Sequence, residues 1–208
     1  MYPRSMIFTI YGCKVKISFL LIGMVSGIIL LDESKTTIWG LFAAVMHEFG
    51  HIFAMTLKNN KPQEINFDIF DIKIKDNNRS RSSYGENILI LFAGPCMNLS
   101  LAAIFFLAYF ITGIDFLLIP MSENLILGIL NILPIESLDG GQILYCLLVK
   151  KLGIQKSEKI VCIVSFIFLV PLSILGFTIL FKSKYNMSLF VVSCYLMVML
   201  VLKKGKFY

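Results

Sequence analysis

Charged residues are scarce in this chain of 208 residues. Asp, Glu, Lys and Arg together make up 15% of the sequence, whereas hydrophobic residues make up 57% and the mean hydropathy is +0.81. A soluble domain usually carries about a quarter charged residues, because it must cover itself with a polar surface. The composition therefore excludes an ordinary soluble globular protein and favours a protein that is embedded in a membrane.

Cysteine pairs that could hold a metal or build a disulfide framework are also missing. The five cysteines are scattered with no CxxC pair, and the chain has only two histidines. A lone cysteine inside an apolar run is usually a small buried residue. Because no internal repeat or low-complexity linker is visible, the sequence predicts a single membrane-embedded domain over 1–208 with no appended soluble domain.

Long apolar stretches dominate what is present. A helix needs roughly 20 apolar residues to cross the hydrocarbon core of a bilayer. Six stretches are near or above that length, although the first and the last are short, and they predict an all-α integral membrane protein with about six transmembrane helices. The segment 8–18 before the first helix alternates weakly, as a short strand or an interfacial segment does. The six stretches are 15–31, 36–57, 87–112, 124–149, 160–181 and 187–202.

The placement of positive charge predicts the orientation. With the N-terminus in the cytosol, 16 of the 19 Lys and Arg residues fall on the cytosolic side, and only Lys35, Lys182 and Lys184 fall outside. Positive loops stay in the cytosol, so we expect a multi-pass protein of the cell membrane with both termini cytosolic. The net charge of +6 then requires no nucleic acid as a partner, and the basic loops face the lipid bilayer.

The second apolar stretch contains the sequence HEFGH at positions 47–51. His47 and His51 are four residues apart, so on a helix they lie on one face, one turn apart, and both rings can reach one metal ion. Glu48 follows the first histidine, as the general base does in the HExxH pattern of zinc proteases. Ionisable groups inside a membrane are costly and usually functional. The motif therefore predicts one zinc ion per chain, Zn2+, with Glu48 as the catalytic residue.

Two histidines leave a catalytic zinc site incomplete, because such a site takes three protein ligands. A carboxylate in the fourth stretch is the expected third ligand, and Asp139 and Glu136 are the candidates. Asp139 is favoured because Pro134 breaks the helix before it and Gly140 and Gly141 permit a close helix approach. In the predicted topology HEFGH and Asp139 both fall in the cytosolic half of the bilayer, so we expect the active site there.

The segment 62–75, between the second and third helices, has the pattern of a small β-hairpin. Its apolar residues change phase after Ile69, as a hairpin or bulge would produce. A substrate helix must unwind before it can be cut. One interpretation is that an edge of this segment pairs with the unwound substrate by strand addition. The alternative is an interfacial hairpin with no role in substrate binding.

Three motifs together resemble the signatures of the site-2 protease family, the intramembrane zinc metalloproteases of peptidase family M50. They are HEFGH at 47–51, AGPCMN at 93–98 and NILPIESLDGG at 131–141, in the order of the family. The short chain is most similar to the bacterial sporulation-type branch, which processes a membrane-associated sigma-factor precursor. The resemblance covers about 36–148, which would be the catalytic core.

The resemblance implies roles for particular residues. His47, His51 and Asp139 would bind zinc, and Glu48 would be the base. Asn98 and Asn131 match asparagines that line the site and support the substrate or the developing oxyanion. Five further residues have structural roles at the site in this interpretation: Gly94, Pro95, Pro134, Gly140 and Gly141.

The resemblance also implies the partners. They are a membrane protein or membrane-associated substrate, with regulatory membrane proteins as a further class, in a bacterial cell. The chain departs from the family at Ser137, where proline is common, and we expect no counterpart of the nucleotide-sensing C-terminal domain of the sporulation branch.

Two other functions compete with this interpretation. A membrane transporter for divalent cations would also need intramembrane His, Glu and Asp, but it has no special need for a glutamate after the first histidine. It usually shows internal symmetry, which the sequence lacks. A different HExxH membrane protease would typically take a glutamate from a later helix as its third ligand. For Gly94 and Pro95 the simpler alternative is a kink that serves only helix packing.

Overall fold

The structure is a computed structural model, and it describes residues 5–10, 13–32, 36–58, 64–67, 72–75, 83–183 and 188–202. Helices dominate these residues and four short strands accompany them, which confirms the predicted fold class. The chain divides into two compact units, residues 1–128 and residues 129–208, which are described in turn. A division into compact units does not decide the number of domains, so the single membrane domain stays a prediction.

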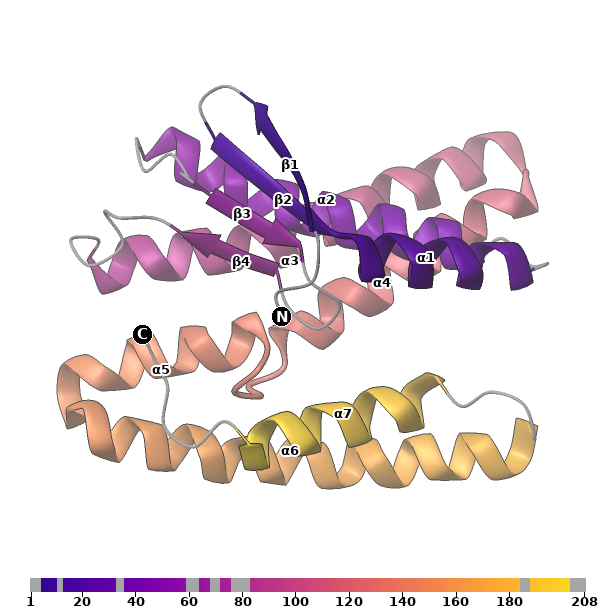
Figure 1. Ribbon diagram of the computed structural model, residues 1–208. Coiled ribbons are helices and arrows are strands. Elements are labelled where there is room, and N and C mark those ends of the chain that lie inside the picture. The colour runs from indigo at the N-terminus through magenta and orange to yellow at the C-terminus, as the bar shows by residue number, and fades with distance from the viewer. Residues whose placement is uncertain are drawn as a thin grey trace. The chain divides into compact units, whose positions relative to one another are not determined.

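The first unit contains a four-stranded sheet with the strand order β1-β2-β3-β4 (Figure 1). β1 (Ser5–Ile10) and β2 (Cys13–Ser18) are antiparallel, β2 and β3 (Glu64–Phe67) are parallel, and β3 and β4 (Ile72–Lys75) are antiparallel. The hairpin expected in the segment 62–75 is therefore present as β3 and β4. Its turn and flanks, including residues 68–71, lie outside the described residues.

The first helix is shorter than the sequence predicts. α1 (Phe19–Leu31) has 13 residues and begins directly after β2, whereas the apolar stretch begins at residue 15. Residues 14–17 alternate between lysine and an apolar residue, which is the period of a strand. They pair with β1 and β3, so the sheet takes residues that hydropathy alone assigns to the helix.

Two long helices lie side by side in the first unit (Figure 1). α2 (Thr36–Leu57) has the predicted bounds, and α3 (Tyr84–Thr112) begins three residues before the predicted start. Ser83 and Glu86 form a capping box that satisfies free backbone donors at the start of α3. Gly113 ends α3 in the left-handed conformation, with φ of 68°.

The fourth apolar stretch is divided between two helices. A short 3-10 turn, η2 (Asp115–Leu117), precedes α4 (Leu118–Ile132), and α5 (Asp139–Leu152) follows a loop at residues 133–138. Pro134 has no N–H and cannot continue α4, which explains the break. The stretch 124–149 is therefore interrupted where Pro134 predicts a break. Asp139 is the first residue of α5.

In the second unit, α6 (Ile154–Ser183) packs beside α7 (Ser188–Leu202) (Figure 1). Ile135, from the loop before α5, packs into the core of this unit and is fully buried. The loop is therefore held by apolar contacts as well as by its two flanking helices. The other core residues of the unit are Leu169, Leu196 and Leu200.

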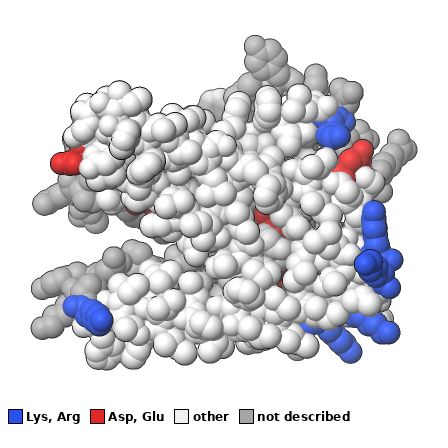
Figure 2. All heavy atoms as spheres, turned by 180° about the vertical axis from the view of Figure 1, so that it is seen from behind, with Lys and Arg blue, Asp and Glu red and all other residues white. Residues whose placement is uncertain are grey.

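The outer surface of the described residues is unusually apolar. Leu30, Phe110 and Ile111 are each at least 80% exposed, and many other large apolar side chains are exposed on the helices. Figure 2 shows a face that is almost entirely uncharged, with its Lys and Arg side chains at the edges. Soluble proteins rarely expose apolar patches of this extent. The surface suits contact with lipid.

Four helical segments of the described residues are long and apolar enough to cross a membrane. They are Thr36–Leu57, Tyr84–Thr112, Asp115–Ile132 and Ile154–Lys182. α1 and α7, with 13 and 15 residues, are shorter than a full span. Length and composition therefore support four of the roughly six predicted spans.

Candidate metal centre

His47 and His51 lie on the buried face of α2. Its buried residues are Ala43, His47, Gly50, His51 and Met55, which recur every three or four positions and face α3. The two histidines are 6% and 7% exposed. The prediction that the two histidines share one face of a helix thus agrees with the structure, and that face is the buried one.

Two glycines let the helices approach closely enough for this arrangement. A Cβ atom on Gly50 would lie 2.6 Å from the carbonyl oxygen of Ala93 on α3. A Cβ atom on Gly94 would lie 2.5 Å from Nε2 of His51 and 2.8 Å from Nε2 of His47. Distances this short do not occur between real Cβ atoms and their neighbours. Gly94 therefore leaves room beside both Nε2 atoms, and Pro95 follows it, buried within α3.

The Nδ1 atoms of both rings are held by oxygen atoms of α3. Nδ1 of His47 lies 2.7 Å from Oδ1 of Asn98, and Nδ1 of His51 lies 2.8 Å from the carbonyl oxygen of Ile90. A carbonyl oxygen only accepts hydrogen bonds. Each Nδ1 therefore donates its proton, which leaves Nε2 of each neutral ring without one.

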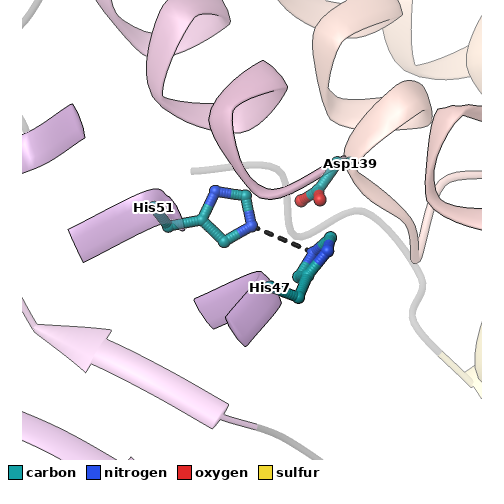
Figure 3. A group of neighbouring side chains, drawn as sticks. All are labelled: His47, His51 and Asp139. Atoms are coloured by element: carbon teal, nitrogen blue, oxygen red, sulfur yellow. Dashed lines mark hydrogen bonds between the residues drawn. The ribbon is translucent and has the colours of Figure 1, made fainter. Parts of the chain in front are cut away.

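The two Nε2 atoms face each other at 3.2 Å, within hydrogen-bond distance (Figure 3). The rings lie nearly edge to face, with centroids 4.8 Å apart and planes at 84°. Two nitrogen lone pairs this close require a cation between them, which is either a shared proton or a metal ion. The arrangement is therefore that of two ligands aimed at one positive ion.

Asp139 begins α5, and its position depends on the tight loop before it. The N–H of Ile135 donates to the carbonyl of Leu133 (2.7 Å), and the N–H of Leu138 donates to the carbonyl of Ile135 (2.8 Å). A Cβ atom on Gly140 would collide with the carbonyl of Ile132, and one on Gly141 would collide with the carbonyl of Ile135. Both glycines are thus required where the first turn of α5 packs on the loop.

Glu136, the alternative third ligand, lies on this loop and is 5% exposed. Its backbone N–H donates to Oγ of Ser165 on α6 (2.8 Å). The potential metal ligands that come together among the described residues are His47, His51 and Asp139, whose ligand atoms lie within 4.8 Å of one another (Figure 3). Glu136 is not part of this group.

The other predicted site residues have different surroundings. Glu48 is on α2 and partly exposed, and Asn131 is partly exposed at the end of α4. The resemblance predicts that Asn98 supports substrate or the oxyanion. In the structure it is fully buried, and its amide bonds to His47, Ala43 and Asn124.

Asn124 is a residue that the sequence reasoning overlooked. Its side chain on α4 is fully buried and accepts a hydrogen bond from Nδ2 of Asn98 (3.0 Å). The only sequence signal was an amide within an apolar stretch, which gives no partner.

Comparison with known proteins agrees with this fold and chemistry. The model of "Peptidase family M50" matches residues 111–172, which include Asp139 and the loop before it. No curated protein matches the chain. A solved structure, the site-2 protease from Methanocaldococcus jannaschii, has the same fold with a TM-score of 0.63. It shares 21% sequence identity, over 99% of this chain and 97% of that chain.

The family match over residues 111–172 and the shared fold support the predicted resemblance to the site-2 protease family. The chain's long apolar helices fit an intramembrane metalloprotease of this type. Both comparisons agree with the predicted resemblance. M50 proteins are zinc metalloproteases, and His47, His51 and Asp139 are residues of the types that bind zinc.

Proposed function

We propose that this protein is a zinc-dependent endopeptidase that hydrolyses a peptide bond of a membrane protein, or of a membrane-associated precursor, within or near the bilayer. His47, His51 and Asp139 hold one zinc ion, and Glu48 is the general base. By resemblance to the sporulation branch, the substrate is a signalling or sigma-factor precursor in a bacterial membrane.

The observation that carries this proposal is the 3.2 Å separation of the two Nε2 atoms. Two nitrogen ligands about 2.05 Å from a tetrahedral zinc ion lie roughly 3.3 Å from each other. The two rings therefore have the separation that one zinc ion requires. Gly94 supports the same interpretation, because the absence of its side chain keeps that space open.

The donor set suits zinc in its charge as well as its geometry. Two neutral imidazoles and one carboxylate would leave a bound Zn2+ with a net charge of about +1. A zinc ion held there would polarise the scissile carbonyl and make water more acidic. The residual positive charge also favours the ionised form of Glu48.

Glu48 supplies the proton transfers. It follows His47 on α2, and it is partly exposed while both histidines are buried. Its carboxylate takes a proton from the attacking water and then gives it to the leaving amine. Asn131, also partly exposed, supports the substrate or the oxyanion.

The free edge of β4 is where we place the unwound substrate. β3 is paired on both sides, by β2 and by β4, so within the described sheet β4 is the edge strand of the predicted hairpin. An edge strand offers unpaired backbone groups to an extended peptide. We also keep the cytosolic placement of both termini and of the active site, together with a single domain over 1–208, as parts of this proposal.

The test uses the full chain purified in detergent. We would measure zinc per chain by mass spectrometry and cleavage of a co-expressed panel of membrane proteins, for wild type, Glu48→Gln and Asp139→Asn. The expected result is about one zinc in wild type and in Glu48→Gln, with cleavage lowered at least about 100-fold in Glu48→Gln. Asp139→Asn should weaken zinc binding.

Glu136→Gln is the matched control, because it removes the charge of the alternative ligand on the same loop. It should keep its zinc. Cleavage that survives Glu48→Gln would contradict the protease mechanism and favour the cation-transport alternative. Loss of zinc in Glu136→Gln, with zinc retained in Asp139→Asn, would show that the third ligand is Glu136 and not Asp139.

A further inference from the structure

A chain of side-chain amides leads from α4 to the metal-binding face of α2. Asn124 on α4 and Asn98 on α3 are both fully buried. Asn98 contacts Asn124 at 3.0 Å and His47 at 2.7 Å. Three helices of the first unit are thus joined by one polar network inside an apolar interior.

The hydrogen bond between Asn124 and the carbonyl of Pro120 determines the direction of the other hydrogen bonds in this network. Nδ2 of Asn124 donates to the carbonyl of Pro120 (2.8 Å), so Oδ1 of Asn124 faces Asn98 as an acceptor. Nδ2 of Asn98 then donates twice, to this oxygen and to the carbonyl of Ala43 (2.9 Å). Oδ1 of Asn98 is left to face His47, and it can only accept.

Reversing the amide of Asn98 would bring its oxygen against two acceptors, Oδ1 of Asn124 and the carbonyl of Ala43. Asn124 provides one of these two unfavourable oxygen–oxygen contacts. Without it, a reversed Asn98 would face only one unfavourable contact and could present its N–H groups to His47. His47 would then carry its proton on Nε2, where no metal can bind.

The packing of α4 supports this role. A Cβ atom on Gly128, one turn after Asn124, would lie 3.3 Å from Cβ of Asn98 and 3.1 Å from Cδ2 of Leu99. Glycine at this position therefore allows α4 to approach α3 at the level of the network. Close approach is what brings the short side chain of Asn124 within reach of Asn98.

We propose that Asn124 is a positioning residue for His47: acting through Asn98, it holds the histidine in the tautomer that leaves Nε2 free to bind the metal. The proposal rests on the proposed function, because it takes His47 as a metal ligand. The alternative is that the two asparagines only join the helices, which polar residues commonly do in membranes. That role would change stability and leave metal affinity unaltered.

The experiment measures zinc affinity, by competition with a chelator, on the full chain in detergent. Asn124→Leu removes the acceptor for Asn98, and we expect zinc to bind about 10-fold more weakly. Asn98→Leu should weaken it by roughly 10–100-fold. The double variant should bind zinc no more weakly than Asn98→Leu alone, because Asn124 acts only through Asn98.

Two further variants control for folding. Asn124→Asp, as the protonated acid, can accept from Asn98 and donate to the carbonyl of Pro120, so its zinc affinity should stay within about threefold of wild type. Ser122→Ala removes a hydroxyl on the same helix that bonds only to the carbonyl of Ile119, and it should leave zinc affinity unchanged. The 15N shifts of the His47 ring in zinc-free protein give an independent record of its tautomer, which should be mixed in Asn124→Leu.

The outcomes separate this inference from the proposed function. Wild-type zinc affinity in Asn124→Leu, with a lower unfolding temperature and an unchanged His47 tautomer, would overturn the positioning role and leave the metalloprotease intact. Independent, additive losses in the double variant would also overturn it. A wild-type protein that binds no zinc would remove the proposed function and this inference together.

Discussion

A methyl group placed at Gly94 tests the metal centre most directly. Its carbon would lie 2.5 Å from Nε2 of His51 and 2.8 Å from Nε2 of His47. Ordinary contacts of a Cβ atom begin at 3.4 Å, so the rings would have to retreat by about 0.9 Å and 0.6 Å. Zinc–nitrogen bonds of about 2.0–2.1 Å tolerate changes of about 0.2 Å. Gly94→Ala should therefore prevent both rings from binding the same ion.

The expected loss of zinc affinity in Gly94→Ala exceeds about 100-fold, since changes behind a ligand already cost 10–100-fold. Chelator competition on protein in detergent measures it. The free energy of unfolding should fall by only about 1–3 kcal/mol from overpacking, partly offset by the better helix propensity of alanine. The protein should thus remain folded while it loses the metal.

Gly85→Ala is the matched control for this substitution. It makes the same change on the same helix, where the nearest atom to the added carbon would be Oγ of Ser83 at 3.9 Å. Zinc affinity and cleavage should be unchanged there. If Gly94→Ala bound zinc as tightly as wild type, the ion would not lie between the two Nε2 atoms, and the metal centre we describe would be refuted.

Two pairs of substitutions test the loop before α5 and the sheet. Ser165→Ala removes the acceptor for the N–H of Glu136 and should weaken zinc binding several-fold. Ser157→Ala is the control, because Ser157 is equally buried on α6 and its hydroxyl donates to the carbonyl of Gly153, just before α6. It should leave zinc binding unchanged, and equal effects would count against the loop contact. Lys73→Pro and Ile74→Pro each remove one N–H from β4, and because successive N–H groups of a strand point to opposite sides, one of them lies on the free edge. The N–H on the free edge makes no bond within the described sheet, so the variant that removes it should keep its unfolding temperature. That variant should lose cleavage, and full cleavage in it would refute strand addition.

Much of the candidate site follows from local pattern. The bounds of α2 match the apolar stretch 36–57, because membrane hydropathy over some 20 residues is a strong signal. A spacing of four placed His47 and His51 on one face, and helical geometry alone guarantees that. Pro134 and the two glycines after Asp139 correctly predicted a break, since proline ends a helix whatever surrounds it.

The parts that the sequence left open depend on contacts between distant segments. Residues 15–18 lie in or beside the first apolar stretch, and their pairing with β1 and with β3, far along the chain, makes them a strand. The surroundings of Asn98 were equally hidden, because a motif does not say which way an amide points. Asn124 gave no signal, since its partner comes from another helix.

The partners of the two histidines have a consequence for the reactivity of the site. Asn98 and the carbonyl of Ile90 orient the rings through uncharged oxygens, where many zinc sites use a carboxylate. A carboxylate partner would make each imidazole a stronger electron donor and dampen the electrophilicity of the ion. It would also add a charge at membrane depth, which is costly. In the proposed zinc site, neutral partners would therefore orient both rings without adding charge at membrane depth, and they would leave the ion strongly electron-withdrawing.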